Sequence, residues 1–256
     1  MNVVFISKNE NSKSIEYMIN YLNYNKYKLF LISPEAEKSK YLLNKINDNF
    51  FLNKQNISNL FKKYNFNGRV GWYFQQFLKY KIVLDIEGED FLIIDGDTIC
   101  SSNLIRKNLL CYTGKQKYLS YYNFYKILFP EHKLSNLSFI TNQMYFKKEY
   151  LKIMLKEIEE KYSMSWIEVF IKLLSKKNAV MFSEYQTYAE YIINNNLDYE
   201  LKKIKIFRRM DLIEDFISPV QALKHYDILS YEYHHKSSFF IKFRMLLYYL
   251  IKRNVG

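Results

Sequence analysis

The chain has 256 residues, of which 49% are hydrophobic and 18% aromatic, and its formal net charge is +12. This length and apolar content are enough for one main domain with a real core. A membrane-spanning helix is excluded because no run of about 18 apolar residues occurs, and the two cysteines, Cys100 and Cys111, lack the spacing of a zinc site or a disulfide framework. The positive charge indicates anionic partners: nucleotides, nucleic acid or an acidic membrane surface. Since no signal-peptide pattern opens the sequence, we expect a cytoplasmic protein.

The first half of the chain alternates strand-like and helix-like segments. Apolar runs predict strands at residues 2–7, 27–33 and 91–95, with a short one at 50–52, and helical spacing predicts helices at 12–23, 35–46, 58–64 and 71–80. This βαβα order implies an α/β fold whose sheet is mostly parallel and flanked by helices.

The strand at residues 91–95 ends abruptly in Asp95-Gly96-Asp97. The period of two in a strand places both carboxylates on one side, and the glycine lets the backbone turn or approach a ligand. Such a pair at a strand end suits Mg²⁺ or Mn²⁺, which also binds diphosphate oxygens. The alternative is an ordinary turn followed by helix-cap residues. A short capped helix expected over residues 102–110 favours the metal site.

The second half is less regular. We expect strands at residues 109–112, 117–121, 138–141 and 203–207, and helices at 149–161, 166–175 and 183–195. Neither a linker rich in Pro, Gly or Ser nor an internal repeat is evident. A single domain over residues 1–235 is therefore expected, followed by a basic amphipathic helix within 236–256.

Three segments resemble a known family: residues 71–79, residues 92–98 with the paired aspartates, and residues 183–188. Their order and spacing are similar to those of bacterial glycosyltransferases of capsule and lipopolysaccharide biosynthesis that have the GT-A fold and are distantly similar to glycosyltransferase family 8. The resemblance covers residues 1–210. It implies a Rossmann-like GT-A fold and a metal-dependent enzyme that transfers a sugar from a nucleotide diphosphate donor, with a UDP-sugar favoured. The acceptor would be a hydroxyl of a bacterial surface glycan or of a lipid-linked precursor.

The resemblance places the aspartate pair at the donor and its metal. We expect Asp97 to bind Mn²⁺ or Mg²⁺ directly, and Asp95 to contact the donor ribose or sugar, or the metal through water. A cation there would neutralise the diphosphate and stabilise the leaving nucleotide.

Two helices are expected to supply further groups. Gln76 and Lys79 share a helix face, with Gln76 suited to sugar hydroxyls and Lys79 to a phosphate, although the Trp72 of this face is more simply a core residue. Glu184 is the candidate base for the attacking hydroxyl in an inverting reaction. In the alternative interpretation, Glu184 only stabilises the first turn of a helix capped by Ser183.

The remaining candidates lie at expected strand ends, where ordinary turns or surface charge are the alternatives. They are Ser7 and Lys8 for the nucleotide, Thr141 and Asn142 for sugar hydroxyls, and Arg208 for the diphosphate. A histidine, His225 or His234, is a weaker candidate for completing the metal site, because the surrounding family 8 motif is missing.

Residues 236–253 combine an apolar helical face with five basic residues. This pattern favours an interfacial helix on anionic lipid, and hence a peripheral protein at the inner face of the cell membrane, over a helix that packs on the domain or in a dimer. Oligomeric state is left open.

The sequence has two alternative functional interpretations. A basic nucleic-acid-binding protein would exploit the charge and the aromatic residues, but the sequence carries no nucleic-acid-binding motif, so we expect no nucleic acid partner. A nucleotidyltransferase or phosphotransferase would use the same aspartate pair, but its glycine-rich phosphate loop is missing.

Overall fold

A central five-stranded sheet organises the molecule. The computed structural model describes residues 1–9, 12–22, 26–41, 43–66, 68–176, 181–231 and 239–252. The sheet has the order β3-β2-β1-β4-β7; the first four strands are parallel, and β7 is antiparallel to β4. The strands are β1 (Asn2–Ile6), β2 (Lys28–Ser33), β3 (Asn44–Asn47), β4 (Asp90–Asp95) and β7 (Gln143–Lys147). The expected α/β fold with a mostly parallel sheet is confirmed.

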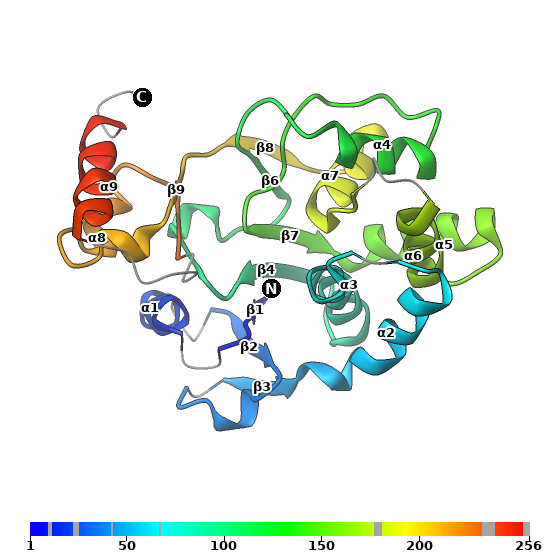
Figure 1. Cartoon of the computed structure of the whole chain (residues 1–256), viewed down its shortest axis with the longest axis horizontal. Coiled ribbons are helices and arrows are strands. Elements are labelled where there is room, and N and C mark those ends of the chain that lie inside the picture. The colour runs from blue at the N-terminus through cyan, green and yellow to red at the C-terminus, as the bar shows by residue number, and fades with distance from the viewer. Residues whose placement is uncertain are drawn as a thin grey trace.

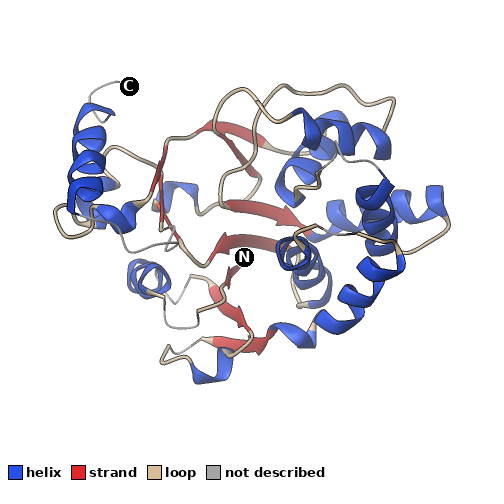
Figure 2. Ribbon diagram, viewed as in Figure 1, coloured by secondary structure: helices blue, strands red, loops and turns tan. Residues whose placement is uncertain are grey.

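Both faces of the sheet are covered, and helices gather on either side of it in Figure 1 and Figure 2. On β4, Phe91 and Ile93 enter one core cluster, whereas Leu92 and Ile94 enter the other. Each of these four side chains is fully buried. Burial on both faces explains why β4 reads as an unbroken apolar run.

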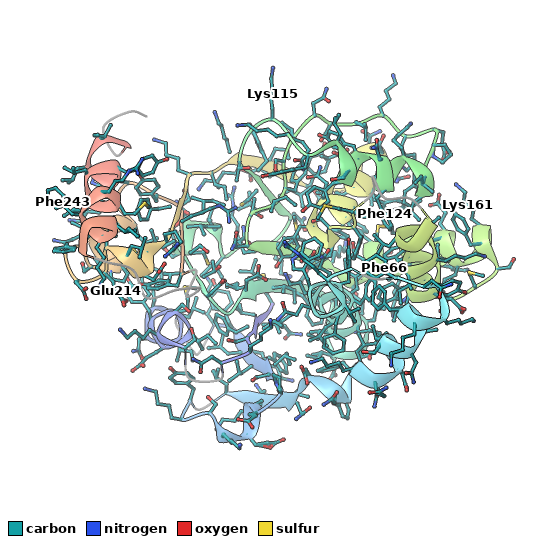
Figure 3. The ribbon with its side chains drawn as sticks, viewed as in Figure 1. Phe66, Lys115, Phe124, Lys161, Glu214 and Phe243 are labelled. Carbon is teal, nitrogen blue, oxygen red and sulfur yellow. The ribbon has the colours of Figure 1, made fainter. Side chains whose placement is uncertain are left out.

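Six helices cover the first face. They are α2 (Lys54–Lys63), α3 (Val70–Asp85), α4 (Leu119–Leu128), α5 (Lys148–Tyr162), α6 (Trp166–Lys176) and α7 (Glu184–Asn194). Aromatic rings fill the space between them: the ring of Phe77 on α3 lies 5.7–6.2 Å from those of Trp166, Phe170 and Phe182. Phe124 of α4 belongs to the same cluster, on the right in Figure 3.

The second face carries α1 (Lys13–Tyr21) and two small sheets. One sheet consists of β5 (Thr98–Cys100), β10 (Ile228–Ser230) and β9 (Ile206–Arg208), and the other of β6 (Leu109–Tyr112) and β8 (Glu200–Lys203). Two more helices follow, α8 (Pro219–Ala222) and α9 (Phe239–Lys252). Because β5 follows β4 directly but pairs with β10, the chain passes from one sheet to another at Asp95-Gly96-Asp97.

The expected helix at residues 35–46 and the strand at 50–52 are wrong. The chain instead forms a 3₁₀ helix, η1 (Ala36–Lys38), then β3, then a second 3₁₀ helix, η2 (Asp48–Phe50). β3 carries no apolar run, since it is an edge strand with three polar residues of four and no fully buried one. The apolar residues Phe51 and Leu52 belong to the core without forming a strand.

Two expected strands in the second half are also wrong. Residues 117–121 lead into α4, where Tyr122, Tyr125 and Leu128 recur every three residues and are buried. Residues 138–141 precede the actual strand, β7. Because β7 is antiparallel to β4, its start lies beside the end of β4, so residues 141–142 still reach that edge of the sheet.

The other departures are local. Residues 102–110 form a 3₁₀ helix, η3 (Ser102–Leu104), and then enter β6, instead of one capped helix. The late strand at 203–207 is divided between β8 and β9, which is followed by the 3₁₀ helix η4 (Met210–Leu212). No helix within the described ranges has the length and apolar content to cross a bilayer.

Candidate functional site

A cleft of about 580 Å³ opens where β1 and β4 end. Its floor is formed by the ends of these strands and by the Asp95-Gly96-Asp97 turn, and its walls come from α3, the start of α7 and the ends of β9 and β10. Parallel strands end at the same edge of their sheet, and open α/β sheets bind ligands there. The fold therefore brings together side chains that are far apart in the sequence.

Gly96 makes the turn at the floor of the cleft. Its N–H donates to the carbonyl of Ile6 at 2.8 Å, and its own carbonyl accepts from the hydroxyls of Ser12 and Ser14 at 2.8 and 2.6 Å. A Cβ at this position would lie 2.3 Å from Cβ of Ser7 and 2.8 Å from the carbonyl oxygen of Ile6. Only glycine lets the turn lie against the end of β1, and this contact holds both aspartates in the cleft.

Lys79 of α3 links two acidic side chains of the cleft, Asp95 and Glu184. Its Nζ lies 2.6 Å from Oδ1 of Asp95 and 2.6 Å from Oε1 of Glu184. The hydroxyl of Tyr185 donates to the same Asp95 oxygen at 3.1 Å, and its ring centroid lies 4.2 Å from the ammonium. Lys79 is 6% exposed, so its ammonium contacts the two carboxylates from the buried side of the cleft.

The charges of this group are set by burial and by the ion pairs. Burial alone would lower the pKa of Lys79, but the carboxylates of Asp95 and Glu184 outweigh it and hold the pKa well above its ordinary value. Burial raises the pKa of Glu184, and the ammonium opposes that shift. Lys79 therefore stays charged, and Glu184 is a carboxylate whose proton affinity is tuned by two opposing effects.

Asp97 lies in the cleft beside this group. Its side chain accepts a hydrogen bond from the Thr98 hydroxyl at 3.2 Å, and its carbonyl accepts one from the backbone of Tyr231 at 2.8 Å. Burial and, next, the Asp95 carboxylate raise the pKa of Asp97 to about 6. Two carboxylates that repel each other in this way are stabilised by a cation between them.

The donor set fits a hard divalent cation. Asp95, Asp97 and Glu184 line the cleft together with three cations: Lys79, which pairs with Asp95 and Glu184, and the exposed Lys8 and Arg208. Within the described ranges, His, Cys, Asp and Glu side chains form no group of three suited to a metal ion. Asp95 and Asp97 would thus supply two ligand side chains, and Mg²⁺ or Mn²⁺ completes such a shell with phosphate oxygens and water.

Gln76 is another residue that α3 brings to the cleft. Its Oε1 accepts the backbone N–H of Glu184 at 3.2 Å, while its buried Nε2 has no partner. A buried donor without a partner costs free energy that a ligand acceptor in the cleft can recover. Trp72, on the same helix face, is half-buried and lines the cleft, although it also packs against the core.

The structure places most of the other predicted residues in the cleft. Ser7, Lys8, Asn142 and Arg208 all line it, with Lys8 and Arg208 exposed at its rim. Asn142 adopts a left-handed conformation with φ of 62°, and its carbonyl accepts the N–H of Asp95 at 3.0 Å.

Two candidates lie elsewhere. Thr141 is fully buried, with its hydroxyl 2.7 Å from the carbonyl of Gln143, and it is not among the residues that line the cleft. His225 packs edge-on against the ring of Tyr249, away from the cleft. His234 lies outside the described residues.

Gln75, Tyr121, Ser230 and Tyr231 are among the cleft-lining residues that the sequence does not indicate. Helical spacing could have identified Gln75, since it lies three residues after Trp72 and four before Lys79 on α3. Tyr121 lies in the segment 117–121, for which the sequence wrongly predicts a strand. Ser230 ends β10 and Tyr231 follows it, and the sequence does not predict this short strand.

The fold and the cleft define an α/β protein with a carboxylate-lined cleft at the end of a mostly parallel sheet. A family model described as a family of unknown function (DUF6492) matches residues 13–216, and the chain belongs to that family. No curated protein matches the sequence.

Solved structures with a similar fold are glycosyltransferases. The galactosyltransferase LgtC, in complex with donor and acceptor sugar analogs, is 11% identical over 97% of this chain and 95% of its own, with a TM-score of 0.49. Mouse xyloside xylosyltransferase 1 is 10% identical over 92% of this chain and 99% of its own, with a TM-score of 0.44. The glycosyltransferase GlyE of Streptococcus pneumoniae TIGR4 is 14% identical over 99% of this chain and 62% of its own, with a TM-score of 0.43.

Proposed function

We propose that the protein is a metal-dependent glycosyltransferase with a nucleotide diphosphate sugar, favoured to be a UDP-sugar, as donor. The observation that carries the proposal is the cleft at the end of β1 and β4, where Asp95 and Asp97 lie beside the Lys79–Glu184 ion pair. The repulsion between Asp95 and Asp97, which after burial raises the pKa of Asp97 to about 6, supports metal dependence, because a cation between the two carboxylates would relieve it.

In the proposed reaction, the bond between the anomeric carbon and the diphosphate oxygen breaks, and its electron pair stays on the nucleotide. A bond forms between the anomeric carbon and the acceptor oxygen, whose proton passes to a base. A bound Mn²⁺ or Mg²⁺ would act as Lewis acid toward the diphosphate. Asp97 is the proposed direct ligand, and Glu184 the proposed base of an inverting reaction.

The chain's own residues orient the substrates. Lys79 fixes the carboxylates of Asp95 and Glu184, so both can accept sugar hydroxyls without rearranging. The unpartnered Nε2 of Gln76 supplies a donor to a sugar oxygen. Lys8 and Arg208 at the rim carry positive charge suited to the nucleotide phosphates.

Binding and turnover test this proposal. UDP, GDP and CMP are added with and without Mn²⁺ in a thermal-shift assay, and UDP-sugars are then assayed for release of UDP. We expect stabilisation by a nucleoside diphosphate only with the metal, and Asp97→Asn should abolish both stabilisation and UDP release. The control is Asp85→Asn, a carboxylate of α3 outside the cleft that pairs with Lys81 at 3.0 Å. Metal-independent nucleotide binding, or normal turnover by Asp97→Asn, would contradict the proposal.

We further propose that the protein acts at the inner face of the cell membrane on a surface glycan or lipid-linked acceptor. The exposed apolar side chains of α9 support this part: Ile241, Phe243, Leu247, Tyr248 and Ile251 are each at least 44% exposed. Arg244 is exposed among them, and the chain as a whole carries a charge of +12. Aromatic and aliphatic side chains mixed with basic ones suit an anionic lipid surface.

A further inference from the structure

An aromatic surface continues outward from one end of the cleft. Tyr121 lines the cleft, and its ring lies 6.1 Å from that of Tyr118 in an edge-on arrangement. Tyr118 and the adjacent Leu119, at the start of α4, are 65% and 69% exposed. We call these three residues the aromatic shelf. Large exposed apolar side chains grouped beside a cleft indicate a binding surface.

The aromatic shelf is attached firmly to the helix that carries Glu184. Oε1 of Gln116 accepts the backbone N–H of Tyr118 at 3.1 Å, and Nε2 of Gln116 donates to Gln186 of α7 at 2.7 Å. The backbone N–H of Met181, just before α7, donates to the carbonyl of Ser120 at 3.1 Å. The exposed rings therefore stand on a backbone with a fixed position relative to the cleft, which lowers the entropy cost of binding a ligand.

Contacts lead in sequence from the aspartates to the shelf. Asp95 and Glu184 share Lys79, and Glu184 and Tyr121 both line the cleft, where burial and then the Glu184 charge raise the pKa of that tyrosine. Tyr121 then contacts Tyr118. A ligand that reacts beside Glu184 and continues outward at this end must pass over these rings.

We propose that the aromatic shelf is an acceptor subsite for a saccharide chain of at least two sugars. The terminal hydroxyl would enter the cleft beside Glu184, and the preceding sugar would stack its apolar C–H face on Tyr118 and Tyr121. The inference rests on the proposed function. A saccharide fits because it offers C–H faces for aromatic rings together with hydroxyls for the polar cleft. The exposed Lys117 beside the shelf extends the range of acceptors to acidic sugars.

Binding to saccharides of increasing length tests the subsite. The protein, saturated with UDP and Mn²⁺, is applied to an immobilised panel of neutral and uronic-acid-containing mono- to hexasaccharides. We expect wild type to bind particular members, and to bind the disaccharide form more tightly than the monosaccharide. Tyr118→Ala should weaken this binding about five- to tenfold and remove the length dependence, while Tyr118→Trp should retain it. The matched control is Phe50→Ala, which removes a 77% exposed ring that does not line the cleft.

The outcomes separate this subsite from the function on which it rests. If wild type binds UDP with Mn²⁺ but no saccharide on the panel, or if Tyr118→Ala binds saccharides as wild type does, the subsite is overturned and the transferase proposal stands. Loss of binding to anionic vesicles by Tyr118→Ala, with saccharide binding intact, also overturns it, since the shelf then contacts lipid. Failure of wild type to bind any nucleotide with Mn²⁺ overturns the transferase proposal itself.

Discussion

Lys79 is a buried cation, and its contribution to stability depends on its two carboxylate partners, Asp95 and Glu184. With an ammonium 2.6 Å from each carboxylate, the cost of burying these charges is offset by their attraction. Removing the cation alone leaves Glu184, which is 4% exposed, as a buried charge without its counterion. The ion pair therefore ties the stability of α3 and α7 to the geometry of the cleft.

Lys79→Met is expected to lower the free energy of unfolding by about 3–5 kcal/mol. Adding Glu184→Gln to this variant should restore part of the loss, because the uncompensated charge is then removed. Urea unfolding of the two single variants and the double variant gives the coupling energy, expected at about 1–3 kcal/mol. Lys81→Met, which breaks an exposed pair on the same helix, serves as control and should change stability by less than about 0.5 kcal/mol. Additive effects of the two substitutions would contradict the assigned ion pair.

Sequence reasoning found the cleft residues whose signal is local. Asp95 and Asp97 follow an apolar run, Gln76 and Lys79 have helical spacing, and Glu184 follows an N-cap serine, whose hydroxyl accepts the N–H of Gln186 at 3.3 Å. The ion pair between Lys79 and Glu184 joins residues 105 positions apart, and no local pattern encodes it. For this reason the sequence predicts a phosphate as the partner of Lys79, while the structure places its ammonium against two carboxylates.

At the scale of elements, the burial of a strand determines whether it can be predicted from the sequence. β1, β2 and β4 are enclosed on both faces and give apolar runs, so their positions followed from the sequence. β3 is a polar edge strand and gave none. Residues 117–121 are predicted as a strand because tyrosine is common in strands, whereas the structure begins α4 at Leu119 and packs this helix against the aromatic core.

The turn between β4 and β5 can be tested by comparing Gly96, which lies in this turn, with Gly71, which lies in α3 and has open space around it. Gly96→Ala should lower the free energy of unfolding by about 1–3 kcal/mol, because the new Cβ would lie 2.3 Å from Cβ of Ser7 and push the turn off β1. The displaced aspartates should also weaken the stabilisation by UDP and Mn²⁺. Gly71→Ala is the control, since no atom lies within 4 Å of its added Cβ and alanine favours the helix by up to about 1 kcal/mol. Urea unfolding of both variants is the measurement; equal stabilities would show that the turn can relax.

At the scale of the molecule, the cleft lies where the two core clusters meet. Each cluster takes alternate side chains of β1 and β4, and the ends of the same two strands form the floor of the cleft. The sheet therefore fixes the site through its most buried strands, while the walls come from α3 and α7 of the first face and from β9 and β10 of the second. The division of the chain near residue 235 stays a prediction. The packing of α9 on the second cluster joins it to the rest of the fold.

The structure divides the apolar residues of α9 between two faces. Tyr249 is 1% exposed and packs against Phe207 and Tyr226, with Leu246 and Leu250 beside it in the second cluster. The other face carries the exposed stripe with Phe243, at the left margin of Figure 3. Both expectations for this helix therefore have a physical basis: one face packs on the domain, and the other is available to a surface.

Substitutions on the exposed stripe separate membrane binding from packing better than deletion of the helix, which would uncover the second cluster. Phe243→Glu combined with Leu247→Glu should weaken binding to vesicles rich in anionic lipid at least about tenfold, because two apolar contacts are lost and two negative charges are added. Thermal stability should change little, since both side chains are more than 40% exposed. Phe216→Glu provides the control, as Phe216 is 44% exposed and lies outside α9. Co-sedimentation at low and high salt is the measurement. Undiminished vesicle binding by the double variant would remove α9 as the membrane contact and leave its packing on the second cluster as the only role for which contacts are described.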